Sequence, residues 1–186
     1  MRCFIAVDID EAMREEIARL QDDLQQKTSL KRSEAKWVEP ENIHLTLKFL
    51  GEVRDQEISE ICRIVEGTAA DYERFSLEIE GVGTFGSPAR VLWAGLRDKP
   101  VLDTLQEHLE ERLANAGWPR ENKKFNPHLT LCRIKSAHAG KVLQKTVQAK
   151  ATEPLGTVFI DSICVYKSDL TNKGPVYTLI SRSMLK

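Results

Sequence analysis

The tetrapeptide His-Leu-Thr-Leu occurs twice in this chain, at residues 44–47 and 128–131. The chain has 186 residues and 4 histidines, so a shuffled sequence of this composition would hold on the order of 0.003 copies. An asparagine precedes each copy, at Asn42 and Asn126, and the copies lie almost half a chain apart. The repetition predicts an internally duplicated fold with one copy in each half.

Both copies have the pattern of a β-strand, in which alternate side chains face opposite sides. His44 and Thr46 then share one face, together with Lys48, while the leucines of the motif face the core. His128 and Thr130 repeat the arrangement in the second half. A pseudo-twofold relation between the halves would bring two imidazoles and two hydroxyls together across a groove.

Such a groove suits acid and base catalysis on a phosphodiester. Near neutral pH one histidine can accept a proton while the other donates one, and threonine hydroxyls can hold non-bridging phosphoryl oxygens. The scheme requires no metal and no cofactor. A single copy of the motif would more often have a structural role. Packing alone, however, would preserve only the leucines in both halves, so the duplication of His and Thr favours a catalytic role.

Hydrophobic spacing predicts the elements that must position the motifs. We expect helices around residues 13–26, 58–69, 102–116 and 137–149, and strands at 2–8, 37–38, 43–51, 75–82, 90–96, 127–134, 154–166 and 176–183. Strands often follow one another directly along the chain. This order favours antiparallel pairing in an α+β fold over a doubly wound parallel sheet.

Composition narrows the function classes. The net charge is −1, so no global positive field draws the protein onto nucleic acid, and any such contact must be local. The four cysteines lie in apolar segments without zinc spacing, as buried free thiols do in reducing compartments. The first residues contain neither a signal peptide nor a membrane span. We therefore expect a cytoplasmic protein.

The sequence resembles the 2H phosphoesterase superfamily, and within it the RNA 2′,3′-cyclic phosphodiesterases, historically called 2′-5′ RNA ligases. The similar stretches span nearly the whole chain and are RCFIAVDI, WVEPENIHLTLKFLGEV, FGSPARVLWAGL, FNPHLTLCRIK and IDSICVYKSDLTNKGPVYTLI. The resemblance implies one bilobal α+β domain over residues 1–186. Its two pseudo-symmetric, mainly antiparallel sheets would carry helices on their outer faces and the two motifs in a central cleft.

The resemblance also implies an activity, the hydrolysis of RNA 2′,3′-cyclic phosphate ends to 2′-phosphomonoesters. By this analogy His44 is the proton donor, His128 is the proton acceptor, and Thr46 and Thr130 bind the phosphate. The residues alone would fit either direction of proton transfer. The implied substrate is RNA with a cyclic phosphate terminus, such as tRNA fragments, or a small cyclic nucleotide, and nothing demands more than a monomer.

Other functions stay open at this point. The enzyme could act on a 2′-5′-linked oligonucleotide or another cyclic nucleotide, or it could ligate RNA ends by the reverse reaction. Alternatively, the two histidines could clamp a terminal phosphate in an RNA-end binding module without chemistry.

Arg133 follows the second motif and resembles a phosphate or nucleotide contact of the family. Strict alternation nevertheless places it on the leucine face, so a solvated strand end is the other interpretation. For Lys48, a solvated side chain and a ligand contact are equally good interpretations. The basic segment 27–36 is expected to be a solvated loop, with an RNA track as the alternative.

Several aromatic and histidine side chains are predicted to have no catalytic role. We expect Trp37, Phe49 and Phe85 to pack in the core, although each could instead stack on a base. His108 and His138 have no threonine two residues later and are predicted to be non-catalytic.

Overall fold

The computed structural model describes residues 1–172 and 174–186. Its α-helices are α1 (Glu11–Thr28), α2 (Ile58–Ala69), α3 (Pro100–Asn115) and α4 (Ala137–Val147). Its strands are β1 (Arg2–Asp8), β2 (Ala35–Trp37), β3 (His44–Glu52), β4 (Phe75–Phe85), β5 (Val91–Leu96), β6 (Leu129–Ile134), β7 (Pro154–Ile160), β8 (Ser162–Thr171) and β9 (Gly174–Met184). The order confirms the α+β prediction.

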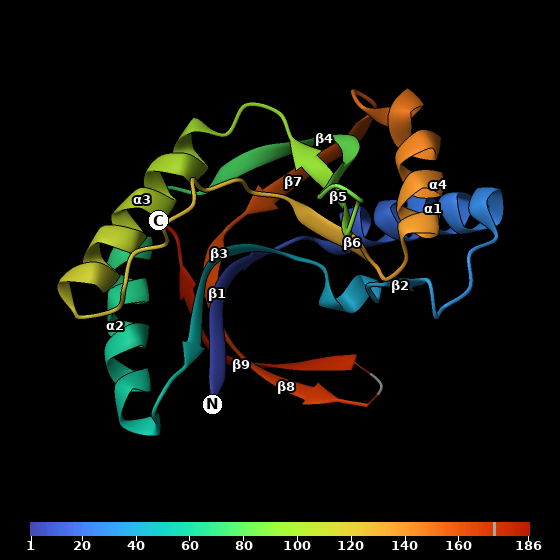
Figure 1. Cartoon of the computed structure of the whole chain (residues 1–186). Coiled ribbons are helices and arrows are strands. Elements are labelled where there is room, and N and C mark those ends of the chain that lie inside the picture. The colour runs from blue at the N-terminus through green and yellow to red at the C-terminus, as the bar shows by residue number, and fades with distance from the viewer. Residues whose placement is uncertain (173) are drawn as a thin grey trace.

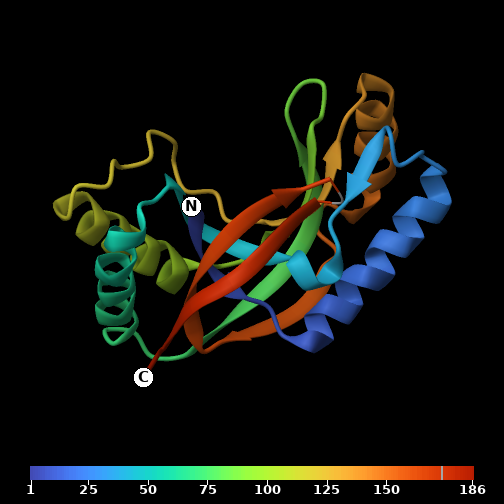
Figure 2. The same cartoon turned by 90° about the horizontal axis from the view of Figure 1, so that it is seen from below.

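Among the described residues, the strands form one antiparallel sheet in the order β7-β4-β5-β6-β3-β1-β8-β9, with β2 paired to β6. The expectation of two separate sheets is therefore wrong, because β3 pairs with β6 and this pair joins the strands of the two halves into one sheet. The predicted strand 154–166 is in fact two strands that change partners at Asp161, since β7 pairs with β4 and β8 pairs with β1. Helices α1 and α4 gather at one end of the sheet, and α2 and α3 at the other (Figures 1 and 2).

The middle of the sheet depends on one residue pair. Strands β3 and β6 are joined by the antiparallel pair Leu45–Leu129. Both side chains are buried, as are Leu47 and Leu131. The leucines of both motifs thus belong to the core, as the alternation predicts. Each buried leucine side chain of this kind contributes about 1.5–3 kcal/mol of transfer free energy.

A β-bulge follows the threonine in both motif strands. Leu47 is skipped in the pairing of β3 with β1, and Leu131 is skipped in the pairing of β6 with β5. A bulge adds one residue, so it reverses which face the following side chains occupy. The residue two after each threonine, Lys48 or Cys132, is consequently buried, and the next one is exposed.

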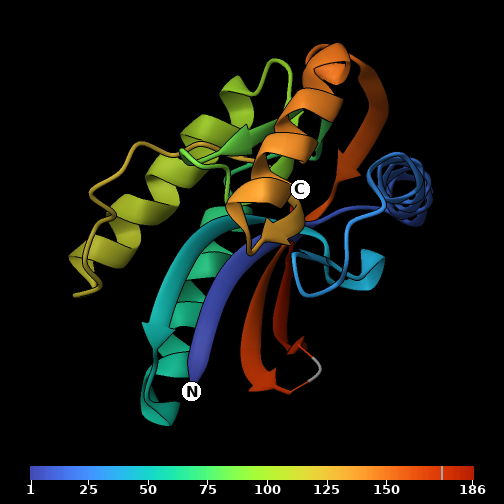
Figure 3. The same cartoon turned by 45° about the vertical axis from the view of Figure 1, so that its right-hand side comes forward.

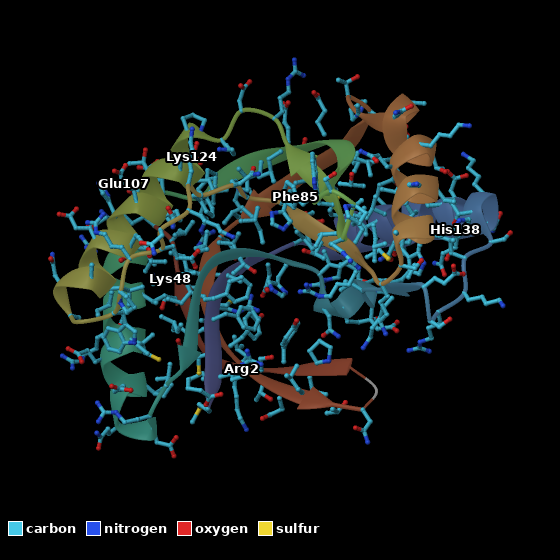
Figure 4. The ribbon with its side chains drawn as sticks, in the orientation of Figure 1. Arg2, Lys48, Phe85, Glu107, Lys124 and His138 are labelled. Atoms are coloured by element: carbon cyan, nitrogen blue, oxygen red, sulfur yellow. The ribbon has the colours of Figure 1, made fainter. Side chains whose placement is uncertain are left out.

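The bulge corrects both interpretations of Lys48. Its side chain is only 3% exposed and lies on the α3 side of β3 (Figure 4). The ammonium Nζ lies 2.8 Å and 2.6 Å from the two carboxylate oxygens of Glu110 and donates to the carbonyl oxygen of Pro119. Glu110 also accepts from the backbone N–H of Glu121. This buried ion pair therefore ties β3 to α3 and to the loop that leads to the second motif.

We expect the substitution Lys48→Met to lower the free energy of unfolding by about 3–5 kcal/mol, because it leaves the Glu110 carboxylate buried without its cation. Chemical denaturation followed by circular dichroism measures the change. The double variant Lys48→Met/Glu110→Leu should recover part of the loss, since neither charge then remains buried. Lys141→Met, at an exposed position of α4, is the matched control and should stay within about 0.5 kcal/mol. Equal stability of the Lys48→Met protein and the control would contradict this account.

Candidate active site

The central strand pair places the four motif side chains on one face. Antiparallel pairing at Leu45–Leu129 sets Thr130 opposite His44 and Thr46 opposite His128. All four side chains are half-buried, whereas the flanking leucines are buried. In a regular antiparallel pair, diagonal neighbours such as the two histidines lie about 7–8 Å apart.

Both imidazoles are oriented by a hydrogen bond to a backbone carbonyl oxygen two residues upstream. Nδ1 of His44 lies 2.8 Å from the carbonyl oxygen of Asn42, and Nδ1 of His128 lies 2.8 Å from the carbonyl oxygen of Asn126. A carbonyl oxygen can only accept, so each Nδ1 carries the hydrogen in this contact. In the neutral ring Nε2 is then the basic nitrogen, and it is the atom free to exchange a proton.

The two histidines differ in their aromatic neighbours. The ring of Phe4 stacks on His44 with centroids 4.7 Å apart, and Tyr177 of β9 meets the same imidazole edge-on at 5.2 Å. His128 has an edge-on contact with Phe85 at 4.9 Å. Phe85 therefore contacts the candidate site from the end of β4, where the sequence predicted core packing (Figure 4).

Comparison with known proteins assigns this arrangement to a family. The model of the LigT-like phosphoesterases matches residues 7–93 and 97–177. The chain belongs to this family. A curated relative from Methanothermobacter thermautotrophicus, named RNA 2′,3′-cyclic phosphodiesterase, is 33% identical over 180 residues, which is 96% of this chain and 95% of the relative.

Solved structures of similar proteins share the fold of this LigT-like phosphoesterase. A Thermus thermophilus protein superimposes with a TM-score of 0.80 at 27% identity, covering 100% of this chain and 98% of that one. E. coli LigT in complex with 3′-AMP has a TM-score of 0.78 at 26% identity, with 99% and 97% covered. The α+β architecture and the phosphoesterase class predicted from the sequence are thereby confirmed.

Burial lowers the pKa of His44 in this phosphoesterase. Desolvation between Phe4 and Tyr177 disfavours the imidazolium and is the largest cause. The hydrogen bond to the Asn42 carbonyl and the Asp8 carboxylate raise the pKa, while the cations Arg14 and Arg133 lower it. The desolvation prevails, so His44 gives up its proton more readily than an exposed histidine does.

The bulge in β6 also decides the position of Arg133. Arg133 pairs with Val91, and Thr130 pairs with Trp93 two residues along β5, so both lie on the same face of the sheet. Strict alternation placed Arg133 on the leucine face, and that interpretation is wrong. The guanidinium is close enough to act electrostatically on both His44 and Tyr177. It is therefore available to an anion held between the histidines.

Helix α1 supports the motif strands from the opposite face, and the sequence pattern did not single out the residues that do this. The buried amide of Gln21 donates to the carbonyl oxygens of Val38 and Leu131 at 2.8 Å and 3.0 Å. Arg14 donates to the carbonyl oxygens of Pro40 and Glu41, just before His44. A polar residue on the otherwise apolar face of a helix is the one sequence signal that could have revealed Gln21.

Other predictions for individual side chains have mixed outcomes. Trp37 packs against the core as expected, but Phe49 is 63% exposed, because the bulge in β3 turns it outward onto the same face as Thr46. The thiol pKa values of Cys132 and Cys164 are raised by burial, to about 12 and about 11. Both thiols stay protonated at neutral pH and cannot serve as nucleophiles.

Two other histidines lie apart from the motifs. His108 is bonded through Nδ1 to the hydroxyl of Tyr72, and His138 is an exposed residue of α4 at the right-hand side of Figure 4. Within residues 1–172 and 174–186, no three His, Cys, Asp or Glu side chains gather in a way that could hold a metal ion. None of the helices in that part of the chain is long and apolar enough to cross a membrane.

We expect His44 to titrate below the ordinary pKa of histidine, because its imidazolium would be desolvated. The measurement is an NMR pH titration of the imidazole Cε1 protons in the intact protein. Spectra of the His44→Gln and His128→Gln variants assign the two resonances. A His44 pKa at or above the ordinary value would show that solvent reaches the ring and that the aromatic packing is not maintained in solution.

Proposed function

We propose that this LigT-like phosphoesterase hydrolyses 2′,3′-cyclic phosphate ends of RNA to 2′-phosphomonoesters. The observation that carries the proposal is the Leu45–Leu129 pair, because it sets each histidine opposite the threonine of the other motif. The name of the Methanothermobacter relative, RNA 2′,3′-cyclic phosphodiesterase, supports the same substrate over nearly the full length of both chains. The solved complex of E. coli LigT with 3′-AMP is consistent with a nucleotide in the equivalent fold.

The proposal includes a duplicated, bilobal site. One motif strand belongs to each half of the chain, and both strands have a β-bulge immediately after the threonine. Both histidines also use the carbonyl oxygen two residues upstream as the acceptor for Nδ1. Two strands with the same bulge and the same histidine orientation support a pseudo-twofold relation between the halves, with the cleft between them.

The reaction follows from the free Nε2 atoms. In the proposed direction, Nε2 of His128 takes a proton from water, whose oxygen attacks the phosphorus of the cyclic ester. The bond from phosphorus to the 3′ oxygen breaks, and that oxygen receives the proton held on Nε2 of His44. The hydroxyls of Thr46 and Thr130 donate to the non-bridging oxygens, and Arg133 adds a positive charge near them.

The lowered pKa of His44 bears on its role as the acid. A histidine with a lowered pKa is a stronger acid, which favours proton transfer to the leaving alkoxide. It must first hold a proton, and the negative charge of a bound phosphodiester favours the imidazolium. The substrate itself would therefore help to protonate His44. One chain supplies all these groups, which is consistent with a monomer.

We expect His44→Ala and His128→Ala each to reduce hydrolysis of 2′,3′-cyclic AMP by about 10²–10⁴-fold, the usual contribution of a general acid or base. Assays follow the 2′-monophosphate product by phosphorus NMR, in excess EDTA. His138→Ala is the matched control and should keep full activity. Full activity in both motif variants, or tight binding of the cyclic nucleotide by the wild type without any product, would defeat the proposal. Loss of wild-type activity in EDTA that a divalent ion restores would defeat the metal-free mechanism.

A substrate with a good leaving group separates the two histidine roles. A 3′-deoxynucleoside 2′-(p-nitrophenyl phosphate) has no neighbouring hydroxyl that could attack the phosphorus, and it releases nitrophenolate, which needs no proton. The His44→Ala variant should therefore recover most of its activity on this ester, whereas His128→Ala should not, because water still has to be activated. Release of nitrophenolate is followed by absorbance. Recovery in the His128→Ala variant instead would reverse the assignment of acid and base.

A further inference from the structure

A basic pocket lies at one end of the site, outside the residues assigned so far. It has a volume of about 320 Å³ and is lined by Arg32, Lys36, Lys135 and Asn172. Arg32 lies in the turn before β2, and Lys36 lies in β2 itself. Lys135 directly follows β6, and Asn172 belongs to the turn between β8 and β9. Figure 3 shows strands β8 and β9 below the segment that follows α1. The predicted loop 27–36 thus supplies two cations to a formed pocket.

Arg133 lies beside the pocket in the strand register and is close enough to the candidate active site to act on His44. Lys36 pairs with Arg133 in the register of β2 and β6, so the two side chains share one face. Lys135 follows two residues after Arg133, and Arg133 acts electrostatically on His44. On the hairpin side, the backbone of Gly174 lies close to Nζ of Lys36.

The charge in the pocket is unbalanced. None of the side chains of Arg32, Lys36 and Lys135 has an ion-pair partner among residues 1–172 and 174–186. Three like charges that share one cavity repel one another, and a bound anion relieves the repulsion. A second surface pocket, between α2 and α3, differs, because it contains Glu60 and its Arg112 is paired with Asp71.

We propose that this basic pocket binds a second phosphate of the substrate, a phosphodiester of the RNA strand that leads to the cyclic end. The proposal rests on the proposed function, because the pocket would act on the same ligand. All four lining side chains are hydrogen-bond donors, and three are cations, which matches the acceptor oxygens of a phosphodiester. An oligonucleotide with a cyclic end would then be a better substrate than a cyclic mononucleotide.

The charge-neutral variant Lys36→Gln/Lys135→Gln tests the inference. Its matched control is Arg63→Gln/Arg74→Gln, which removes the same charge from two exposed positions that have no ion pair among the described residues. We compare kcat/KM on 2′,3′-cyclic AMP, on the same nucleotide with a 5′-phosphate, and on the dinucleotide ApA with a cyclic end. Binding of an RNA tetranucleotide ending in a 2′-phosphate, measured by fluorescence anisotropy, gives a readout that does not depend on turnover.

We expect the pocket variant to lose about tenfold in kcat/KM on the dinucleotide, the scale of one charge-assisted contact, and to be unchanged on 2′,3′-cyclic AMP. The slope of log affinity against log salt for the tetranucleotide should fall by about 0.7, the value for one neutralised phosphate of a single strand. A similar loss is expected on the 5′-phosphorylated mononucleotide, because its 5′-phosphate takes the position of the phosphodiester in the dinucleotide. An unchanged kcat/KM on the dinucleotide would overturn the proposal.

Equal behaviour of the pocket variant and the control in both assays would also overturn it. Failure of the proposed function has a different signature, because the wild type would then turn over neither cyclic substrate. The anisotropy measurement would still decide whether the pocket binds the strand.

Discussion

The antiparallel pairing of Leu45 with Leu129 is the constraint on which the rest of the site depends. Both leucines must be buried, and in a strand the residues on either side of a buried one must face the other way. The same pairing therefore fixes four polar side chains on one face, in a cross-strand arrangement with each histidine opposite a threonine. The geometry of the candidate active site is a consequence of where the core lies.

The two β-bulges convert this regular pattern into an asymmetric site. Each bulge buries the residue two positions after the threonine and exposes the next, but the sequence differs between the two strands. In β3 the outcomes are a buried Lys48 and an exposed Phe49, and in β6 they are a buried Cys132 and an exposed Arg133. One side of the site gains an apolar surface and the other a cation. Together with the stacking of Phe4 on His44, this difference distinguishes two histidines that the motif alone makes equivalent.

Charge in this protein is arranged locally. The overall balance of 27 basic and 28 acidic residues leaves almost no net field, yet Lys36 and Lys135 lie in one pocket beside the site, with no counter-ion among the described residues. In the core, by contrast, the buried cation of Lys48 is neutralised by the carboxylate of Glu110. An unpaired cation costs little at a surface that solvent reaches and much in the core. The position of each cation therefore separates those that stabilise the fold from those available to a ligand.

The sequence by itself determined the α+β class, most helices and strands, and the two His-x-Thr pairs, because periodicity and repetition are local properties of the chain. It could not locate the bulges, since a bulge arises from the register between strands far apart in sequence. For that reason it placed Lys48 and Arg133 on the wrong faces and Phe49 in the core. The joining of the described strands into one sheet, the change of partners at Asp161, and the desolvation of His44 by Phe4 and Tyr177 were likewise decided by tertiary structure. Each depends on which distant segments pack together, and burial energies of many side chains set that choice jointly.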